Sequence, residues 1–133
     1  LLKVIDGYDV FRGWRAAIGL RDITIQRITY GSESELVTTK LTFPVPVSKI
    51  GLFVEEDIPQ DWPAGTWITY YLSVNGSDWV VAPKLGEVTL EQSFTPNSPT
   101  RDVYLRAIVR NNPSDFHRTP KLRHFALQGL PAR

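Results

Sequence analysis

The sequence predicts an all-β domain of roughly eight or nine strands, arranged as a sandwich or a barrel. Runs of alternating apolar and polar residues recur about every dozen residues, with turn-forming residues between them. No stretch of more than a few residues shows the apolar period that is typical of a helix. Residues 65–83 contain the clearest β-hairpin, because Asn75 and Gly76 supply the positive-φ pair of a tight turn between two alternating strands.

The N-terminal part of the chain predicts short strands. Residues 1–14 are expected to form one or two of them around a turn at Asp6 and Gly7. Residues 21–30 are strongly strand-like, but their apolar residues change parity in the middle of the run. We therefore expect either a β-bulge at Gln26 or Arg27, or a strand that is buried on both faces.

The next run, residues 35–43, alternates cleanly and predicts a single strand whose inward side chains are Val37, Thr39, Leu41 and Phe43. Pro44 and Pro46 follow this run. Because neither proline can donate to a ladder, the segment is expected to turn there or to lie on an edge. Residues 48–55 predict the following strand, with the inward side chains Ile50, Leu52 and Val54.

The hairpin at residues 65–83 is expected to have one face in the core and one face outside it. The core face carries Ile68, Tyr70, Leu72 and Val74. Trp79 is expected opposite Leu72 or Val74, depending on the length of the loop, and would be the largest core residue of the hairpin. The other face carries Trp67, Thr69, Tyr71 and Ser73. It is expected to lie under a second sheet, under a neighbouring protein, or against a ligand such as a sugar ring.

The C-terminal part predicts further strands separated by loops. Residues 88–94 predict a strand with Val88, Leu90 and Phe94 facing inward, and residues 95–100 form a loop by composition. A strand over residues 102–110 is expected to point Val103, Leu105, Ala107 and Val109 inward. A loop over residues 111–120 then leads to a final strand over residues 121–130.

Length and composition predict one globular domain over residues 1–133. Hydrophobic residues make up 42% of the chain and charged residues 22%, as is typical of globular proteins. Because there is no cysteine, the chain can form neither a disulfide scaffold nor a thiolate metal site. No apolar run approaches the ~18 residues of a membrane helix, so no membrane contact is expected. The chain begins at Leu1 and contains no methionine, so we expect a fragment or a processed part of a longer protein.

Charge is spread unevenly along the chain, although the net charge is only +1. From Arg101 onward seven Lys or Arg residues stand against Asp102 and Asp115, whereas the first hundred residues hold eight against twelve Asp or Glu. Such asymmetry fits nucleic-acid binding, pairing of the N- and C-terminal strands, or copies that pack acidic side to basic side. Because nucleic-acid-binding domains are usually far more basic, no nucleic-acid partner is expected.

Two segments, KIGLFVEEDIPQDWPAGTWITYYLSVNGSDWVVAP and RDVYLRAIVRNNPSDFHRTPKLRHFALQG, resemble the galactose-binding-like, discoidin-type jelly roll. More narrowly, they resemble the versions in tail, baseplate and other structural proteins of bacteriophages, in which a strand of the type ITYYxSxNGxxW precedes a late TPxLxxFxL pair. The resemblance covers residues 36–129 and implies a single-domain antiparallel β-sandwich used for assembly, for receptor contact, or for both. Sugar-binding members hold their ligand in loops at one end of the sandwich, often with a calcium ion nearby. No loop residues of this chain align with that site.

Candidate catalytic or metal-binding sets are few. Asp115, His117 and His124 match no established metal-ligand spacing. By alternation His124 falls on the side of Leu122 and Ala126, which predicts a partly buried imidazole with a satisfied partner. The sequence contains no GxSxG elbow, no glycine-rich phosphate loop and no recognisable pair of catalytic carboxylates. An enzyme is therefore not expected.

The acidic loop after residue 54 carries Glu55, Glu56, Asp57 and Asp61, whose carboxylate oxygens could bind calcium. Their spacing lacks the D-x-D-x-D-G pattern of a dedicated calcium site. A solvated loop is favoured over a weak calcium loop, and no other cofactor is expected.

These observations lead to two functions. The first, from the resemblance, is a non-enzymatic structural component of a bacteriophage virion, assembled in the host cytoplasm, that contacts other virion proteins or copies of itself. The alternative is a carbohydrate-binding module that recognises a cell-surface glycan through Trp62, Trp67 and Tyr71, since aromatic faces stack on sugar rings. The first function predicts that Trp67 and Tyr71 are covered by protein in the native assembly. The second predicts at least one tryptophan exposed beside Asn, Asp or Glu at a loop end.

Overall fold

The computed structural model describes residues 3–12, 25–29, 33–64, 67–115 and 118–132. These residues are mostly in β-strands, with no α-helix and one short 3-10 helix. None of them belongs to a helix that is long and apolar enough to span a membrane. The elements are β1 (Lys3–Arg12), β2 (Ile25–Thr29), β3 (Glu33–Thr38), β4 (Leu41–Asp57), β5 (Ile68–Ser73), β6 (Val80–Val81), η1 (Leu90–Gln92), β7 (Thr100–Arg110) and β8 (Lys121–Pro131). The predicted all-β fold is confirmed.

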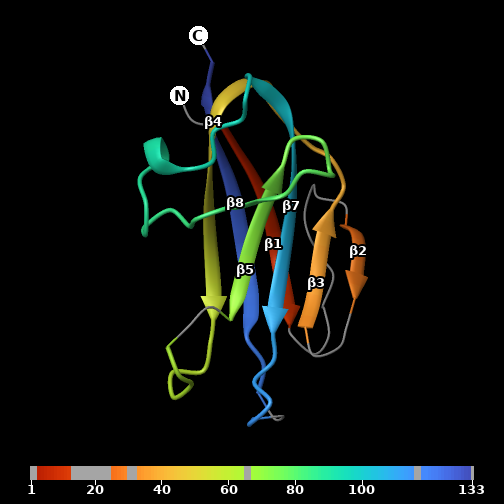
Figure 1. Ribbon diagram of the computed structural model, residues 1–133, viewed down its shortest axis with the longest axis vertical. Helices are drawn as coiled ribbons and strands as arrows, with labels where there is room; N and C mark the ends of the chain where they lie inside the picture. Colours follow the sequence, from red (N-terminus) through yellow and green to blue (C-terminus); the bar gives the residue numbers. More distant parts are fainter. Residues whose placement is uncertain (1–2, 13–24, 30–32, 65–66, 116–117, 133) are drawn as a thin grey trace.

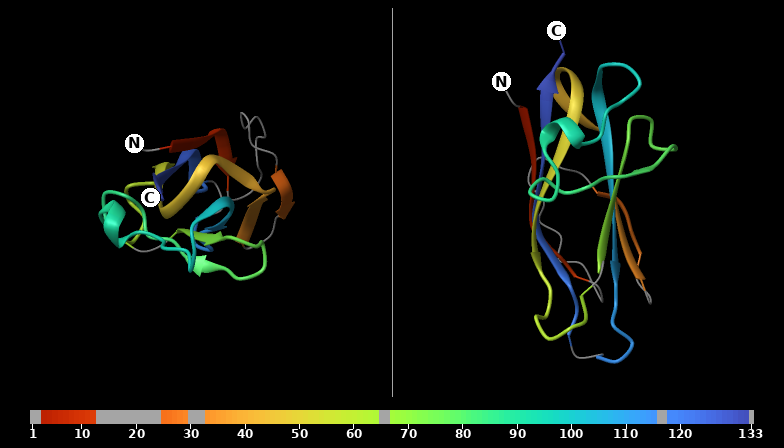
Figure 2. Two further views of the ribbon diagram at one scale, coloured as in Figure 1. Left: turned by 90° about the horizontal axis from the view of Figure 1, so that it is seen from above. Right: turned by 60° about the vertical axis from the view of Figure 1, so that its left-hand side comes forward.

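The strands form two layers that face each other, as the turned view in Figure 2 shows. One layer has the strand order β1-β8-β4, and the other has the order β2-β3-β7-β5-β6. All of these strand pairs are antiparallel. The layers are joined at one corner, where the start of β4 pairs with β7 and Leu41 lies opposite Val103. Figure 1 shows β7 and β5 in front of β8 and β1. The architecture is therefore an antiparallel sandwich.

The core lies between the two layers and is built from alternate residues of β4, β5, β7 and β8. The inward side chains of β7 are those that the alternation predicts, and all four are fully buried: Val103, Leu105, Ala107 and Val109. Arg106 and Arg110 are only partly buried and pair with acidic residues of β3. The alternation of apolar and polar residues in β7 thus decides which face of the layer β2-β3-β7-β5-β6 is turned toward the core.

The predicted single strand over residues 35–43 is wrong. The chain leaves β3 after Thr38 and enters β4 at Leu41, and both halves of the run pair with β7. The register shifts by one residue between the pair Val37–Arg106 and the pair Leu41–Val103. Thr38 is fully buried, and its Oγ1 accepts a hydrogen bond from the backbone N–H of Leu105 at 3.1 Å. As a result Leu36, and not Val37, joins the core between the layers. The break at residues 39–40 exchanges the inward and outward faces of the run.

β4 continues through Pro44 and Pro46, but the chain turns there as predicted. It passes from pairing with β7 at Thr42 to pairing with β8 at Lys49, which the arch of β4 in Figure 1 shows. The ladder between β4 and β7 is interrupted between Thr42 and Val47, and this irregular stretch tolerates residues that have no N–H to donate. A second irregularity, between Val47 and Lys49, precedes the buried residues of the next run. Ile50 and Leu52 are buried and Val54 packs against the core, as predicted.

The N-terminal strands differ from the prediction in one respect and agree in another. Asp6 and Gly7 form no turn, since they pair with Ala126 and Phe125 within a continuous β1. In β2 the predicted bulge is confirmed, because Ile25 lies opposite Thr38 and Arg27 opposite Val37, which leaves Gln26 as the extra residue. Residues 1–2, 13–24 and 30, on which parts of both predictions fall, lie outside the described residues.

The hairpin has a longer loop than Asn75-Gly76 alone predicts. Ser73 Oγ accepts from the N–H groups of Asn75 and Gly76 at 3.2 and 2.9 Å, and Asn75 Oδ1 accepts from those of Ser77 and Asp78, both at 2.8 Å. Gly76 has the expected positive φ, 80°. The side-chain-capped loop needs more residues than a tight turn, and this changes the pairing of the two strands.

The hairpin register places Leu72 opposite Val80 and Tyr71 opposite Val81. Ile68, Tyr70 and Leu72 are buried as predicted, but Val74 is exposed. Trp79 is only partly buried and does not belong to the core, so its predicted place as the largest core residue of the hairpin is wrong.

We expect Trp79→Ala to lower the free energy of unfolding by about 1 kcal/mol or less, since side chains outside the core contribute little. Urea denaturation at constant pH measures this change. A loss of the ~3–5 kcal/mol that truncation of a core aromatic costs would place Trp79 back in the core.

The predicted strand over residues 88–94 is replaced by η1. Thr89 caps this helix, since its N–H donates to Gln92 Oε1 at 3.1 Å, and Gln92 is exposed. The segment 84–94 lies along the edge of β4 and bonds to it through Leu85 N–H to Leu52 O at 2.7 Å and Ile50 N–H to Phe94 O at 2.9 Å. A side chain at Gly51 would collide with leucines of this segment, so the glycine permits the close approach.

Candidate functional site

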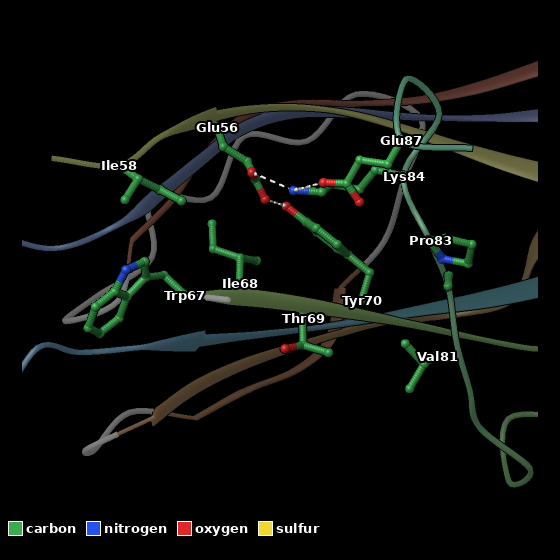
Figure 3. A pocket seen from close by; sticks show the side chains of 11 residues that line it. Glu56, Ile58, Trp67, Ile68, Thr69, Tyr70, Val81, Pro83, Lys84 and Glu87 are labelled. Atoms are coloured by element: carbon green, nitrogen blue, oxygen red, sulfur yellow. Dashed lines mark hydrogen bonds and ion pairs between the residues drawn. The ribbon is translucent and has the colours of Figure 1, made fainter. Parts of the chain in front are cut away.

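A pocket of about 240 Å³ opens where the end of β4, the start of β5 and the segment after β6 meet (Figure 3). Its apolar lining includes Ile58, Trp67 and Ile68. Its charged lining is Glu56, Lys84 and Glu87. The side chain of Tyr70 crosses from β5 toward β4 and ends at Glu56. The pocket therefore has apolar sides and a charged cluster at one end.

Glu56 holds the charged cluster together. Tyr70 Oη donates a hydrogen bond of 2.5 Å to Glu56 Oε2, and Lys84 Nζ donates one of 3.1 Å to Glu56 Oε1. Lys84 also forms an ion pair of 3.4 Å with Glu87. Tyr70 is 2% exposed, so the carboxylate gives its hydroxyl the partner that a buried tyrosine needs.

Burial raises the pKa of the Tyr70 hydroxyl strongly, and the neighbouring charge and hydrogen bond of Glu56 raise it further. Burial alone would lower the pKa of Lys84, but the hydrogen bond and charge of Glu56, together with Glu87, outweigh it and raise that pKa. At neutral pH Tyr70 is therefore neutral and Lys84 is charged. Neither group is tuned to exchange protons or to attack a substrate near pH 7, so the arrangement suits binding and structural bracing.

The raised pKa of Tyr70 predicts a loss of stability in alkali. Unfolded tyrosine ionises near its ordinary pKa of 10.0, whereas folded Tyr70 stays protonated, so its contribution is intact below that pH and is lost as the pH rises above it. We expect the free energy of unfolding to fall more steeply above pH ~10 in the wild type than in Tyr70→Phe. Urea denaturation between pH 8 and pH 11.5, roughly, measures the slope, with Tyr71→Phe as the control for loss of a hydroxyl. Equal slopes in wild type and Tyr70→Phe would contradict the assignment.

The three aromatic candidates do not form one site. Trp62 is 8% exposed, and its Nε1–H donates to Asp115 Oδ2 at 3.0 Å. Trp67 is partly exposed and lies against Trp62, with ring centroids 4.8 Å apart and a tilt of 59°. Tyr71 lies elsewhere, on the outer face of its layer, where the Arg106 guanidinium is 5.4 Å from the ring centroid. Of the three, only Trp67 lines the pocket.

The four acidic residues that could have formed a weak calcium loop are also dispersed, and the first three of them lie on β4 rather than in a loop. Glu55 is exposed and Glu56 belongs to the pocket. Asp57 pairs with Arg123 at 2.7 Å, and Arg118 clasps Asp61 through two bonds of 2.6 Å. In each case the arginine hydrogen bond lowers the pKa of the aspartate. Within the described part of the chain, no group of three or more His, Asp or Glu residues could hold a metal ion.

Arg118 also links this loop to the loop after β7. Besides Asp61 it binds Asp115, with its Nη2 2.6 Å from Asp115 Oδ2. Asp115 also accepts the hydrogen bond from the Trp62 indole N–H, so this one aspartate connects the two loops at this end of the sandwich.

His124 faces away from the core. In the β4–β8 ladder Glu55 lies opposite His124 and Glu56 opposite Leu122, which leaves Arg123 as an extra residue in a bulge. His124 is partly buried, as predicted, but it lies on the other face from Leu122, which is buried in the core, so the prediction that these two share one side is wrong. His117, the remaining histidine, lies outside the described residues.

A second hollow, of about 480 Å³, lies between the β5–β6 hairpin and residues 92–97. We call it the hairpin groove. Its walls include Val74, Val80, Val81, Phe94 and Pro96. Sequence reasoning missed both hollows, because the residues that line them come together only through the shifted hairpin register and the course of segment 84–94. Trp67 and Glu56, which the sequence singled out separately, do line the 240 Å³ pocket, and the hydroxyl of Tyr70 is a further local signal because a buried tyrosine needs a polar partner.

Comparison with models of protein families, with curated proteins and with solved structures finds no match for this chain.

Proposed function

We propose that the protein is a non-enzymatic structural component of a bacteriophage virion, in the tail, the baseplate or a related part, and that it acts through protein–protein contacts. The observation that carries the contact role is the exposed apolar surface of the β5–β6 hairpin. Val74, Val80 and Val81 are 37%, 52% and 60% exposed and belong to one short stretch of chain. Exposed apolar side chains that are grouped in this way mark interaction sites. The resemblance of residues 36–129 to phage structural domains supports the virion setting.

The outer face of the same layer has the opposite character. Arg106 pairs with Glu35 at 2.5 Å, and Arg110 pairs with Glu33 at 3.4 Å and donates to Thr69 at 2.8 Å. These rows of paired charges run across β3, β7 and β5 and are well suited to contact with water. The apolar hairpin is therefore a local feature, which favours a specific contact.

Mass spectrometry of intact virions, produced from the genome that encodes the chain, tests this proposal. Peptides of this chain are expected to sediment with the particle and to cross-link to another virion protein. Particles that are complete without the chain would refute the proposal.

The second candidate is a carbohydrate-binding module, and one observation favours it. Trp67 is partly exposed and lines the 240 Å³ pocket together with the charged Glu56 and Lys84. An aromatic face beside groups that bind hydroxyls is a common feature of sugar sites.

A glycan array, with calcium and with chelator, separates the two candidates. For a virion component we expect no binding by the folded wild-type domain. We expect Trp67→Ala to keep a near-native thermal unfolding curve, because the tryptophan is partly exposed, and to weaken the assembly contacts if they cover it. The protein would instead be a carbohydrate-binding module if it bound a glycan, if Trp67→Ala abolished that binding, and if Tyr71→Phe preserved it.

A further inference from the structure

The hairpin loop contains Asn75 followed by Gly76, a pair that is prone to spontaneous deamidation because glycine has no side chain to shield its backbone nitrogen. Asn75 is exposed and Gly76 is partly exposed, so water reaches both residues. In this reaction Gly76 N attacks Asn75 Cγ, the N–Cγ bond forms and the Cγ–Nδ2 bond breaks. The proton of Gly76 N leaves with Nδ2 as ammonia. Water then opens the resulting cyclic imide and leaves aspartate or isoaspartate at position 75.

The turn itself requires this reactive pair. Gly76 has a φ of 80°, which residues with a side chain rarely adopt, and a Cβ there would lie 3.4 Å from the ring of Tyr104. Asn75 Oδ1 accepts hydrogen bonds from the N–H groups of Ser77 and Asp78, both at 2.8 Å. Its Nδ2 donates to Asp78 Oδ2 at 2.6 Å, so the carboxamide is used at both of its ends.

The hydrogen bonds of residues 73–78 hold the loop in one conformation, which we call the closed loop, and two of them are lost in the imide. Gly76 N–H donates to Ser73 Oγ at 2.9 Å, and the imide nitrogen carries no hydrogen. The Nδ2 group that donates to Asp78 leaves as ammonia. Ser73 is fully buried, so its hydroxyl also shields the Gly76 N–H from the base that must remove the proton. Because these bonds stabilise the starting state and not the transition state, the closed loop slows the reaction.

We propose that Asn75-Gly76 is a modification site, at which deamidation is slow in the closed loop and proceeds when the loop opens. Local opening of a surface loop costs much less free energy than global unfolding, so the reaction occurs in protein whose core is intact. The inference rests on the loop alone and is independent of the virion role proposed above.

Deamidation changes the loop in two ways. Asn75 and Asp78 both line the hairpin groove, and an aspartate at position 75 places a second carboxylate where Nδ2 donated to Asp78. The two like charges repel each other. Isoaspartate also routes the main chain through the former side chain, which lengthens the backbone before Gly76 and disrupts the closed loop. The modified protein is therefore expected to keep its core and to lose the closed loop.

Mass spectrometry of the protein, incubated in one mildly alkaline buffer with and without unfolding urea, tests the proposal. The ratio of the unfolded to the folded rate at position 75 gives the protection by the fold and removes the effect of neighbouring sequence. We expect the folded wild type to deamidate more slowly by about tenfold or more, as the loss of two hydrogen bonds predicts. Asn97, which is exposed and precedes Ser98, is the internal control for the incubation.

Three variants identify the cause of the protection. Ser73→Ala removes the acceptor of the Gly76 N–H and is expected to lower the protection about threefold to tenfold, the range of one hydrogen bond. Asp78→Ala removes the acceptor of Nδ2 at an exposed position, so it carries the test even if Ser73→Ala does not fold. Ser77→Ala is the matched control and is expected to leave the protection unchanged, since Ser77 takes part in the described hydrogen bonds of the loop through its N–H.

Hydrogen exchange at Gly76 gives an independent measurement, because the proton that exchanges is the one that must be removed before attack. Exchange of this amide and deamidation are expected to accelerate together in Ser73→Ala. Equal rates in the folded and unfolded wild type would overturn the proposal. It would also be overturned if Ser73→Ala and Asp78→Ala both kept the protection of the wild type.

Discussion

Phe43→Ala is expected to destabilise the domain by about 3–5 kcal/mol, a large share of the roughly 5–15 kcal/mol that stabilises a typical domain. Phe43 lies on β4 with 0% exposure and belongs to the core cluster between the layers. Truncating it removes the whole ring from a close-packed environment and leaves a cavity next to Gly129, where even a Cβ would contact the ring. Urea denaturation monitored by tryptophan fluorescence measures the loss.

Phe53 provides the control for this experiment, because it lies on the same strand and is 42% exposed. Phe53→Ala is expected to change the free energy of unfolding by about 1 kcal/mol or less. Both phenylalanines have odd numbers, yet one faces the core and the other faces outward, because β4 is irregular between Thr42 and Lys49. Similar losses in the two variants would show that this change of face is incorrect.

Gly129→Ala is expected to cost about 1–3 kcal/mol through overpacking. A Cβ at position 129 would lie 2.5 Å from Val47 Cγ1 and 3.0 Å from Phe43 Cε1, and both neighbours have 0% exposure. Valine has a stiff side chain that cannot rotate away without strain, so the strands β4 and β8 would have to move apart. Thermal or urea unfolding of the variant measures the cost.

A double-mutant cycle with Val47→Ala identifies the cause. Val47→Ala alone leaves a cavity, but it also removes the atom nearest to the new methyl group. The double variant is therefore expected to be more stable than the sum of the two single losses predicts. Strict additivity would mean that the cost of Gly129→Ala arises somewhere other than at Val47.

The sequence predicts best where a strand is regular and its partners are long. The inward face of β7 follows from alternation alone, because its ladders with β3 and β5 keep one register from end to end. The bulge at Gln26 was also predictable, since the apolar residues of that run could share a face only with one extra residue.

Prediction fails where one residue changes the register. Trp79 lies outside the core because the side chains of Ser73 and Asn75 stabilise a loop that is longer than the turn favoured by Asn75-Gly76. The exchange of faces at residues 39–40 has no local signal, because Thr38 is as compatible with a solvent-exposed site as with the buried bond that it makes to Leu105.

The pocket could not be predicted from local patterns for a related reason. Glu56 and Lys84 are 28 positions apart and meet only because segment 84–94 returns along β4. The acidic residues near Glu56 look like one cluster in the sequence, yet in the structure Asp57 pairs with Arg123 and Asp61 pairs with Arg118. Long-range pairing of charges, which depends on the complete fold, decides which carboxylates remain together.

The course of segment 84–94 along β4 bears on how the protein behaves at high concentration. From Lys49 to Asp57 β4 pairs with β8 along one side, and an uncovered second edge of this strand would be a template for copies of the same chain to stack into fibrils. The two backbone hydrogen bonds to Ile50 and Leu52 occupy part of this edge, and the leucines above Gly51 cover it. By covering this edge, segment 84–94 opposes aggregation. A larger residue at Gly51 would push the segment away and expose the edge, even if the core stayed intact.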